Sequence, residues 1–259
     1  MSFSETQLSY WLAAFMWPLI RISAMLTTAP VVSSRQTPVH YRLGLALILT
    51  WMMIPLLPAP PVVDTFSYQA LLILLQQVAV GLIMGFVLQM VFGALVFGGQ
   101  VVAYSMGLGF ASMVDPQNGV QVPVVSQFYL ILATLLFLVL DGHLLLIELL
   151  YQSFQTFPVA TDGISRNGLS DVVGWGSRLF GGGLLMALPV MASLLLVNLG
   201  MGIVTRAAPQ LNIFAVGFPI TMLIGFVLIW ASLPDVMDNF QVLLQDGFSL
   251  IKRLLFIGG

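Results

Sequence analysis

The chain carries six long apolar segments, and these constrain its fold more than any other feature of the sequence. We expect helices at about 10–32, 43–57, 70–102, 124–151, 178–204 and 213–233. A membrane-spanning helix needs about 20 consecutive, mostly apolar residues. Because backbone polar groups in lipid find no water to bond, the predicted fold class is an all-α membrane protein with about six hydrophobic helices.

Composition excludes the common soluble classes. Of the 259 residues, 59% are apolar and 7% are charged, and the mean hydropathy is +1.03. About 25% of the residues of an ordinary soluble domain are charged, and one globular core cannot hide this much apolar surface. A net charge of −2 with eight Lys and Arg also excludes a basic surface for nucleic acid. We therefore expect helices that face lipid or partner chains.

The two ends of the chain differ in character. Glu5 is the only charge before Arg21, so the N-terminus lacks the basic region of a cleavable signal, and the first helix is expected to be retained. After Pro234, apolar residues recur at helical spacing, which predicts a C-terminal amphipathic helix at the membrane interface or on a partner. Its apolar positions are Phe240, Leu243, Leu244, Phe248, Ile251 and Leu255. Pro189 and Pro219 predict kinks or breaks within the fifth and sixth helices.

The segment between the third and fourth helices, residues 104–123, is unusually apolar for a connection and holds one charge, Asp115. Glycines allow backbone shapes closed to other residues, and the run from Asp115 to Gly119 is a strong turn signal. Irregular backbone at membrane depth is tolerated where protein buries it or a cavity adjoins it. Both a pore plug and a re-entrant loop packed on its own bundle fit. The candidate plug residues are Met106, Gly107, Leu108, Gly109, Phe110, Met113, Asp115, Pro116, Asn118 and Gly119.

Several polar residues lie inside the apolar segments. Asp141 and Glu148 are seven residues apart and would share one helix face with Gln127, with His143 nearby. They fit a proton relay, but we favour the simpler reading, in which the span ends near Asp141, in water or in a partner interface. Arg21 could be their counter-ion, could extend to the interface, or could pair with a neighbouring subunit. Glycines, amides and hydroxyls elsewhere predict close helix packing; they include Gly81, Gly85, Gln89, Gly98, Gly99 and Asn198.

Catalytic and metal-binding motifs are weak. Ser105 follows an alanine where a nucleophile elbow needs glycine, so a hydrolase built on Ser105 and His143 is disfavoured. The two histidines have no ligand cluster at metal spacing, and the chain has no cysteine. We therefore expect a protein that is not an enzyme and that has no cofactor and no metal site.

Two stretches resemble one family in combination: the loop from Gly107 to Gly119, and the run RAAPQLNIFAVGFPITMLIG from Arg206 to Gly225. They are similar to the FliR family of flagellar export proteins, which is related to the SctT proteins of injectisomes. The motif residues of the second stretch are Arg206, Pro209, Gln210, Asn212, Phe214, Gly217 and Pro219. Thr221 departs from the lysine that many relatives carry there.

The resemblance implies a subunit of an export gate in the bacterial inner membrane, at the flagellar basal body. One copy would join FliP and FliQ subunits, with FlhA and FlhB nearby, and unfolded flagellar proteins would pass through. Residues 1–151 would resemble FliP, residues 152–259 would form a FliQ-like hairpin, and the loop around Phe110 would plug the pore. A virulence injectisome subunit and a proton-coupled solute transporter remain alternatives, although no inverted repeat favours the transporter.

Overall fold

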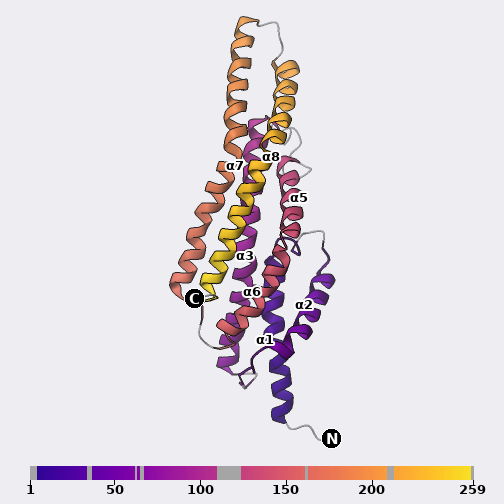
Figure 1. Cartoon of the computed structure of the whole chain (residues 1–259), viewed down its shortest axis with the longest axis vertical. Coiled ribbons are helices and arrows are strands. Elements are labelled where there is room, and N and C mark those ends of the chain that lie inside the picture. Colours follow the sequence, from indigo (N-terminus) through magenta and orange to yellow (C-terminus); the bar gives the residue numbers. More distant parts are fainter. Residues whose placement is uncertain are drawn as a thin grey trace. The chain divides into compact units, whose positions relative to one another are not determined.

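The structure, a computed structural model, is helical throughout its regular elements (Figure 1). It describes residues 5–33, 37–61, 63–64, 67–109, 124–160, 163–208 and 213–257, without the side chains of residues 5, 6, 8 and 213–216. The elements are α1 (Glu5–Thr28), α2 (Val39–Met53), the 3-10 helix η1 (Ile54–Leu56), α3 (Tyr68–Ser105), α5 (Val124–Val139), α6 (Gly142–Thr156), α7 (Arg166–Ala207) and α8 (Ile213–Leu254). Within these residues the fold class predicted from the sequence is confirmed.

The helices are long and apolar enough to cross a membrane. Five described stretches pass by length and composition, and α5 with α6 makes a sixth if the two count as one bent span. This number agrees with the six apolar segments of the sequence. The protein is therefore a membrane protein with five or six candidate spans.

The predicted fourth helix is wrong as one continuous rod, because it breaks at Asp141. α5 ends at Val139, Asp141 takes the left-handed conformation with φ of 54°, and α6 begins at Gly142. Aspartate is one of the few residues besides glycine that tolerate this conformation. The break means that Gln127 and Glu148 lie on different helices and do not share a face with Asp141.

The prolines break neither of the last two helices. α7 continues through Pro189, and α8 continues through both Pro219 and Pro234. Breaks at Pro189 and Pro219 are therefore wrong, while kinks there stay a prediction. The segment after Pro234 continues α8 and is not a separate helix. A proline removes one backbone donor, and side-chain hydroxyls compensate for such losses in membrane helices. In α7 the carbonyl that loses its donor is that of Leu185, four residues before Pro189.

The amphipathic pattern of the C-terminal segment is confirmed in the last part of α8 and the residue that follows it. Its six predicted apolar positions are buried, whereas Gln245, Ser249 and Lys252 between them are exposed. The apolar side therefore packs within the chain itself, and this side is not left free for a membrane surface or a partner.

The chain divides into two compact units, each described by itself. The first comprises residues 1–90, 138–175 and 245–259. In it α3 packs against α1 through Gly81 and Gly85. A Cβ atom on Gly81 would lie 2.8 Å from Ala24 Cβ, and one on Gly85 would lie 2.6 Å from the Met25 carbonyl oxygen. The predicted packing role of this glycine pair is thus confirmed.

The second unit comprises residues 91–137 and 176–244. Here α3 touches α7 through glycine, since a Cβ on Gly98 would lie 2.7 Å from the Gly183 carbonyl oxygen. Gly99 lets α5 approach, and the Ser126 hydroxyl on α5 donates to the Val96 carbonyl oxygen at 3.0 Å. The Phe92 ring packs edge-on against two further rings, those of Phe137 and Phe240, with centroids 5.6 Å and 5.3 Å away.

Substitution of Gly85 by leucine is expected to separate α3 from α1. Inserting extra atoms into a well-packed helix contact costs about 1–3 kcal/mol of stability. At Gly85 the new side chain would meet backbone atoms of Met25 and Ala29, which cannot move aside like a side chain. Gly44→Leu in α2 is the matched control, because nothing lies within 4 Å of its Cβ position. Leucine favours a helix by up to about 1 kcal/mol over glycine, so the control should unfold at an equal or higher temperature. Thermal unfolding in detergent measures both, and equal melting of the two variants would contradict the packing.

Candidate functional site

The apolar loop predicted as a plug starts from a defined turn at the C-terminus of α3. The Leu108 N–H donates to the Ala103 carbonyl oxygen and the Gly107 N–H donates to that of Tyr104, both at 3.0 Å. This pair of bonds is a Schellman motif, which needs a left-handed residue, and Gly107 supplies it with φ of 82°. The first residues of the loop therefore leave the helix in a fixed direction.

Met106 attaches this turn to α8. Its side chain is fully buried, and a Cβ atom on Gly225 would lie 2.7 Å from Met106 Cε and 2.8 Å from Met106 Cγ. The methionine thus fills the space that any larger residue at position 225 would occupy. A flexible thioether chain adapts well to such a gap.

Asn198 and Thr221 form a polar connection at the same place. The Asn198 side-chain amide on α7 donates to the Ser105 carbonyl oxygen at 3.4 Å. The Thr221 hydroxyl on α8 lies 3.4 Å from the Asn198 amide oxygen and donates to the Gly217 carbonyl oxygen at 3.0 Å. The last carbonyls of a helix have no partner within the helix, so Asn198 satisfies one at the end of α3. Residues of α3, α7 and α8 therefore meet at what we call the loop root: Ser105, Met106, Gly107, Asn198, Thr221 and Gly225.

Part of the predicted plug lies in this described region. Met106, Gly107, Leu108 and Gly109 follow the end of α3. The other candidates lie outside the described residues, and their role stays a prediction: Phe110, Met113, Asp115, Pro116, Asn118 and Gly119.

The family motif is also partly described. Arg206 is exposed in the last turn of α7, and Gly217 and Pro219 lie in the first turns of α8, where Gly217 is buried. Phe214 lies in α8 without a described side chain. Pro209, Gln210 and Asn212 fall outside the described residues. Sequence inspection missed Thr221 as a member of the loop root, although its unusual residue type was visible.

Arg21 has partners that the sequence did not reveal. It is fully buried, and its Nε donates to the Gln77 amide oxygen at 2.8 Å. Its terminal nitrogens donate to the carbonyl oxygens of Ser153 and Phe157, each at 2.9 Å. The guanidinium also lies 4.2 Å from the centroid of the Phe154 ring. These carbonyls end α6, where the negative end of the helix dipole favours a cation.

The Arg21 network continues to the connection after α6. The Gln77 side-chain amide donates to the Gln76 amide oxygen at 2.9 Å, and the Ala160 N–H donates to the same oxygen at 3.3 Å. All of these groups belong to the first unit. The network therefore holds residues 157–160 against α1 and α3.

Of the roles considered for Arg21, pairing with the acids of the fourth helix is wrong. Asp141 and Glu148 are exposed, and Glu148 accepts a hydrogen bond from the Gln152 amide at 3.0 Å. His143 is half-buried, and its Nδ1 finds no hydrogen-bond partner among the described residues. Arg21 neither reaches the interface nor is left for another subunit, because helix-end carbonyls and Gln77 surround it. Gln89 is exposed on α3.

The described part of the chain gives little support to catalysis. The Ser105 hydroxyl donates to the Val101 carbonyl oxygen at 2.9 Å, the common backbone bond of a helical serine. Among the described residues no group of three His, Cys, Asp or Glu side chains could hold a metal ion. The arrangement at the loop root is suited to positioning a loop.

Gly225→Leu is expected to expel Met106 and to loosen the loop root. Since the chain has no cysteine, Leu108→Cys gives a single thiol for maleimide labelling next to Met106. Labelling should become severalfold faster when Gly225→Leu is added. Gly200→Leu on α7 is the control, because nothing lies within 4 Å of that Cβ position. Equal labelling rates in the two leucine variants would show that Met106 does not restrain the loop.

Comparisons with known proteins give the same family as the resemblance of the two sequence stretches. The family described as "Bacterial export proteins, family 1" matches residues 12–247. The chain is 39% identical to flagellar biosynthetic protein FliR of Escherichia coli strain K12 over 252 residues, which are 97% of this chain and 96% of that one. It is 36% identical to FliR of Pectobacterium carotovorum subsp. carotovorum, covering 98% and 97% of the two chains. For FliR of Bacillus subtilis strain 168 the identity is 31%, with 95% and 96% covered.

Proposed function

We propose that this chain, which belongs to the bacterial export proteins of family 1, acts as the FliR-type subunit of a flagellar type III export gate. One observation carries the proposal: relatives named as flagellar biosynthetic protein FliR match nearly the whole chain, up to 39% identity. The match is not confined to one apolar segment, so generic hydrophobicity does not account for it.

The proposed location is the bacterial inner membrane at the flagellar basal body. One copy would assemble with FliP and FliQ, next to FlhA and FlhB, with residues 1–151 as the FliP-like portion and residues 152–259 as the FliQ-like hairpin. The exposed apolar side chains of α7 and α8 support such an assembly, since they need lipid or protein partners to cover them. Examples are Leu185, Leu196 and Trp230.

In the proposed mechanism the loop after α3 seals the gate against ions at rest. Unfolded flagellar proteins would displace it during export, while the proton-motive force and an associated ATPase supply the energy. The loop root supports this role, because it holds the first loop residues through Gly107, Met106 and Asn198 while the loop itself is apolar. No cofactor and no enzymatic step of this chain is needed.

Deletion of the gene in the bacterium that encodes this chain tests the proposal. Hook and filament proteins should disappear from the medium, and the cells should lose motility. Plasmid-borne wild-type chain should restore both. Continued flagellar export with loss of a different secreted set would instead assign the chain to an injectisome.

Asp141→Ala combined with His143→Ala separates the export gate from a proton-coupled transporter. Both side chains lie next to the break between α5 and α6, and neither contacts Arg21, so export should remain within about twofold of wild type. Alanine tolerates the left-handed conformation of Asp141 poorly, at a cost of about 1–2 kcal/mol, so the amount of assembled protein is measured beside export. Secreted hook protein, measured by immunoblot, reports the outcome. Complete loss of export from normally assembled protein would favour the transporter.

A further inference from the structure

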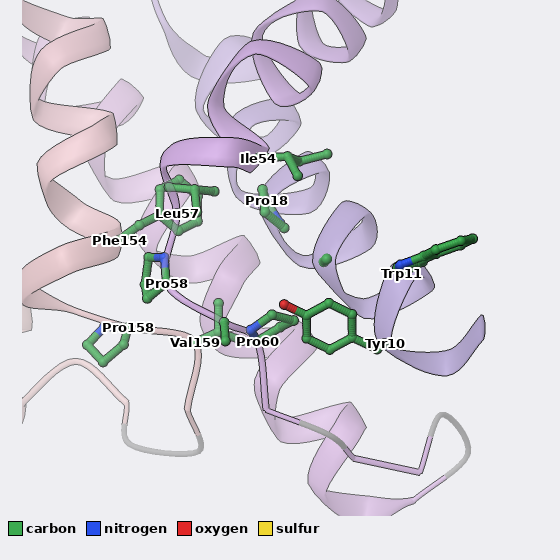
Figure 2. A pocket seen from close by; sticks show the side chains of 12 residues that line it. Tyr10, Trp11, Pro18, Ile54, Leu57, Pro58, Pro60, Phe154, Pro158 and Val159 are labelled. Atoms are coloured by element: carbon green, nitrogen blue, oxygen red, sulfur yellow. The ribbon is translucent and has the colours of Figure 1, made fainter. Parts of the chain in front are cut away.

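The first unit contains a cavity whose role the export function does not explain. Its volume is about 290 Å³, and it lies between the start of α1, the connection after α2 and the end of α6 (Figure 2). Tyr10 and Pro18 line it from α1, Leu57 and Pro58 from the connection, and Phe154 and Pro158 from the end of α6 and beyond. In Figure 2 Tyr10 points toward the prolines of the connection.

The lining selects a neutral, apolar ligand. None of the lining residues is charged, and four of them are prolines, which have no backbone N–H. An anion would therefore find few donors. A cation would find no carboxylate among the lining residues.

The wall formed by residues 154–159 is held in place from behind. Arg21 binds the carbonyl oxygens of Ser153 and Phe157, and Gln76 accepts the Ala160 N–H. Because buried hydrogen bonds to a charged group are strong, this wall does not depend on a ligand for its position. The cavity is therefore preformed, as most binding sites for small molecules are.

The position of the cavity along the helices identifies the ligand. Tyr10 and Trp11 stand at the start of the candidate span Ser9–Thr28, and Leu57 follows the end of the candidate span Val39–Leu56. Tyrosine and tryptophan gather where the bilayer meets water. The neighbouring surface is apolar, with Trp51 76% exposed and Leu56 61% exposed. We propose that this cavity binds the acyl chain of a phospholipid that enters from the membrane interface.

Photo-crosslinking of the full chain in its native membrane assembly tests this proposal. The probe is a phosphatidylethanolamine with a diazirine in one acyl chain, and the same lipid with a headgroup diazirine is the comparison. The acyl probe should label peptides that contain Leu57, Pro58 and Phe154 severalfold more than other apolar peptides. Uniform labelling of all exposed apolar helices would overturn the proposal.

Cavity-filling variants make the test specific. Ala14→Phe and Ala59→Phe place a ring in the cavity from two different walls and should reduce acyl labelling of these peptides severalfold. Ala231→Phe, at an exposed position on α8, is the matched control and should leave labelling unchanged. If Ala14→Phe does not fold, Ala59→Phe in the connection decides.

Two further results of the crosslinking experiment would overturn the proposed acyl-chain site. Undiminished labelling in a folded filling variant would contradict the site. Labelling that appears only after partner subunits are stripped away would assign the cavity to a partner side chain and would also overturn the proposal. Because the readout is lipid attachment, the result does not depend on whether the chain exports flagellar proteins.

Discussion

Deletion of residues 110–118, with Gly109 joined to Gly119, is expected to leave an assembled export gate that leaks ions. The deletion removes the apolar part of the loop and keeps Gly107, whose left-handed turn ends α3. Since Met106 and Asn198 remain, the helices that meet at the loop root should keep their packing. Conductance of the purified gate in planar bilayers should rise severalfold, and cells should lose membrane potential when the variant is expressed.

A second variant tests whether the apolar side chains of the loop, and not only its length, seal the gate. Replacing the same residues by an equally long Gly and Ser segment keeps the length of the connection and removes its apolar side chains. This replacement should leak almost as much as the deletion, because a flexible polar linker stays hydrated and does not form a dry seal. Conductance equal to that of wild type in the assembled deletion variant would remove the plug assignment.

Arg21→Met is expected to destabilise the first unit by several kcal/mol. Methionine is unbranched and avoids a buried charge, but it leaves the Gln77 amide oxygen and the Phe157 carbonyl oxygen without their donor. The Ser153 carbonyl oxygen keeps the bond from the Phe157 N–H at 3.0 Å. Each buried polar group that loses its partner costs about 1–3 kcal/mol. The variant no longer buries a cation, which returns part of this loss, but the two unpaired acceptors outweigh that gain.

The thermal unfolding temperature in detergent and the protein level in cells measure the effect. Arg21→Lys should fall between wild type and Arg21→Met, because lysine keeps the charge but lacks the planar fork that reaches several acceptors. Arg166→Met, at an exposed position at the start of α7, is the control and should change stability by about 0.5 kcal/mol or less. An Arg21→Met protein as stable as this control would show that the buried network is not what holds the end of α6.

Those features that depend on local sequence were predictable. The apolar segments gave the helices, because length and hydropathy decide whether a segment can span lipid. The spacing of Gly81 and Gly85 predicted a close helix contact, and α1 is found there. The C-terminal pattern, from Phe240 to Leu255, predicted one buried helix side, and these positions are buried.

The failures involve the backbone or distant partners. The sequence did not predict that Asp141, which precedes a glycine, would take a left-handed conformation and divide a helix. Pro234 was expected to end a helix, but α8 continues through it. The sequence alone does not show whether neighbouring groups satisfy the carbonyl that a proline leaves without a donor. Three roles were left open for Arg21, as a counter-ion of carboxylates, at the interface or with another subunit. Its real partners were missed because backbone carbonyls at a helix end do not show in a list of side chains.

The candidate site was predictable only in part. The glycines after Tyr104 indicated irregular backbone, and Gly107 has the positive φ that this requires. Asn198 was recognised as a packing residue, but its partner is the backbone carbonyl of Ser105, which lies 93 positions away in the sequence. Contacts of that kind depend on how helices pair, which no single segment encodes.

Native mass spectrometry in mild detergent tests the central claim most directly. This chain, with an affinity tag, would be co-expressed with the FliP and FliQ proteins of the same bacterium and purified through the tag. The account predicts one discrete hetero-oligomer that contains a single copy of this chain. A stable monomer or homodimer that leaves both partners behind would contradict it.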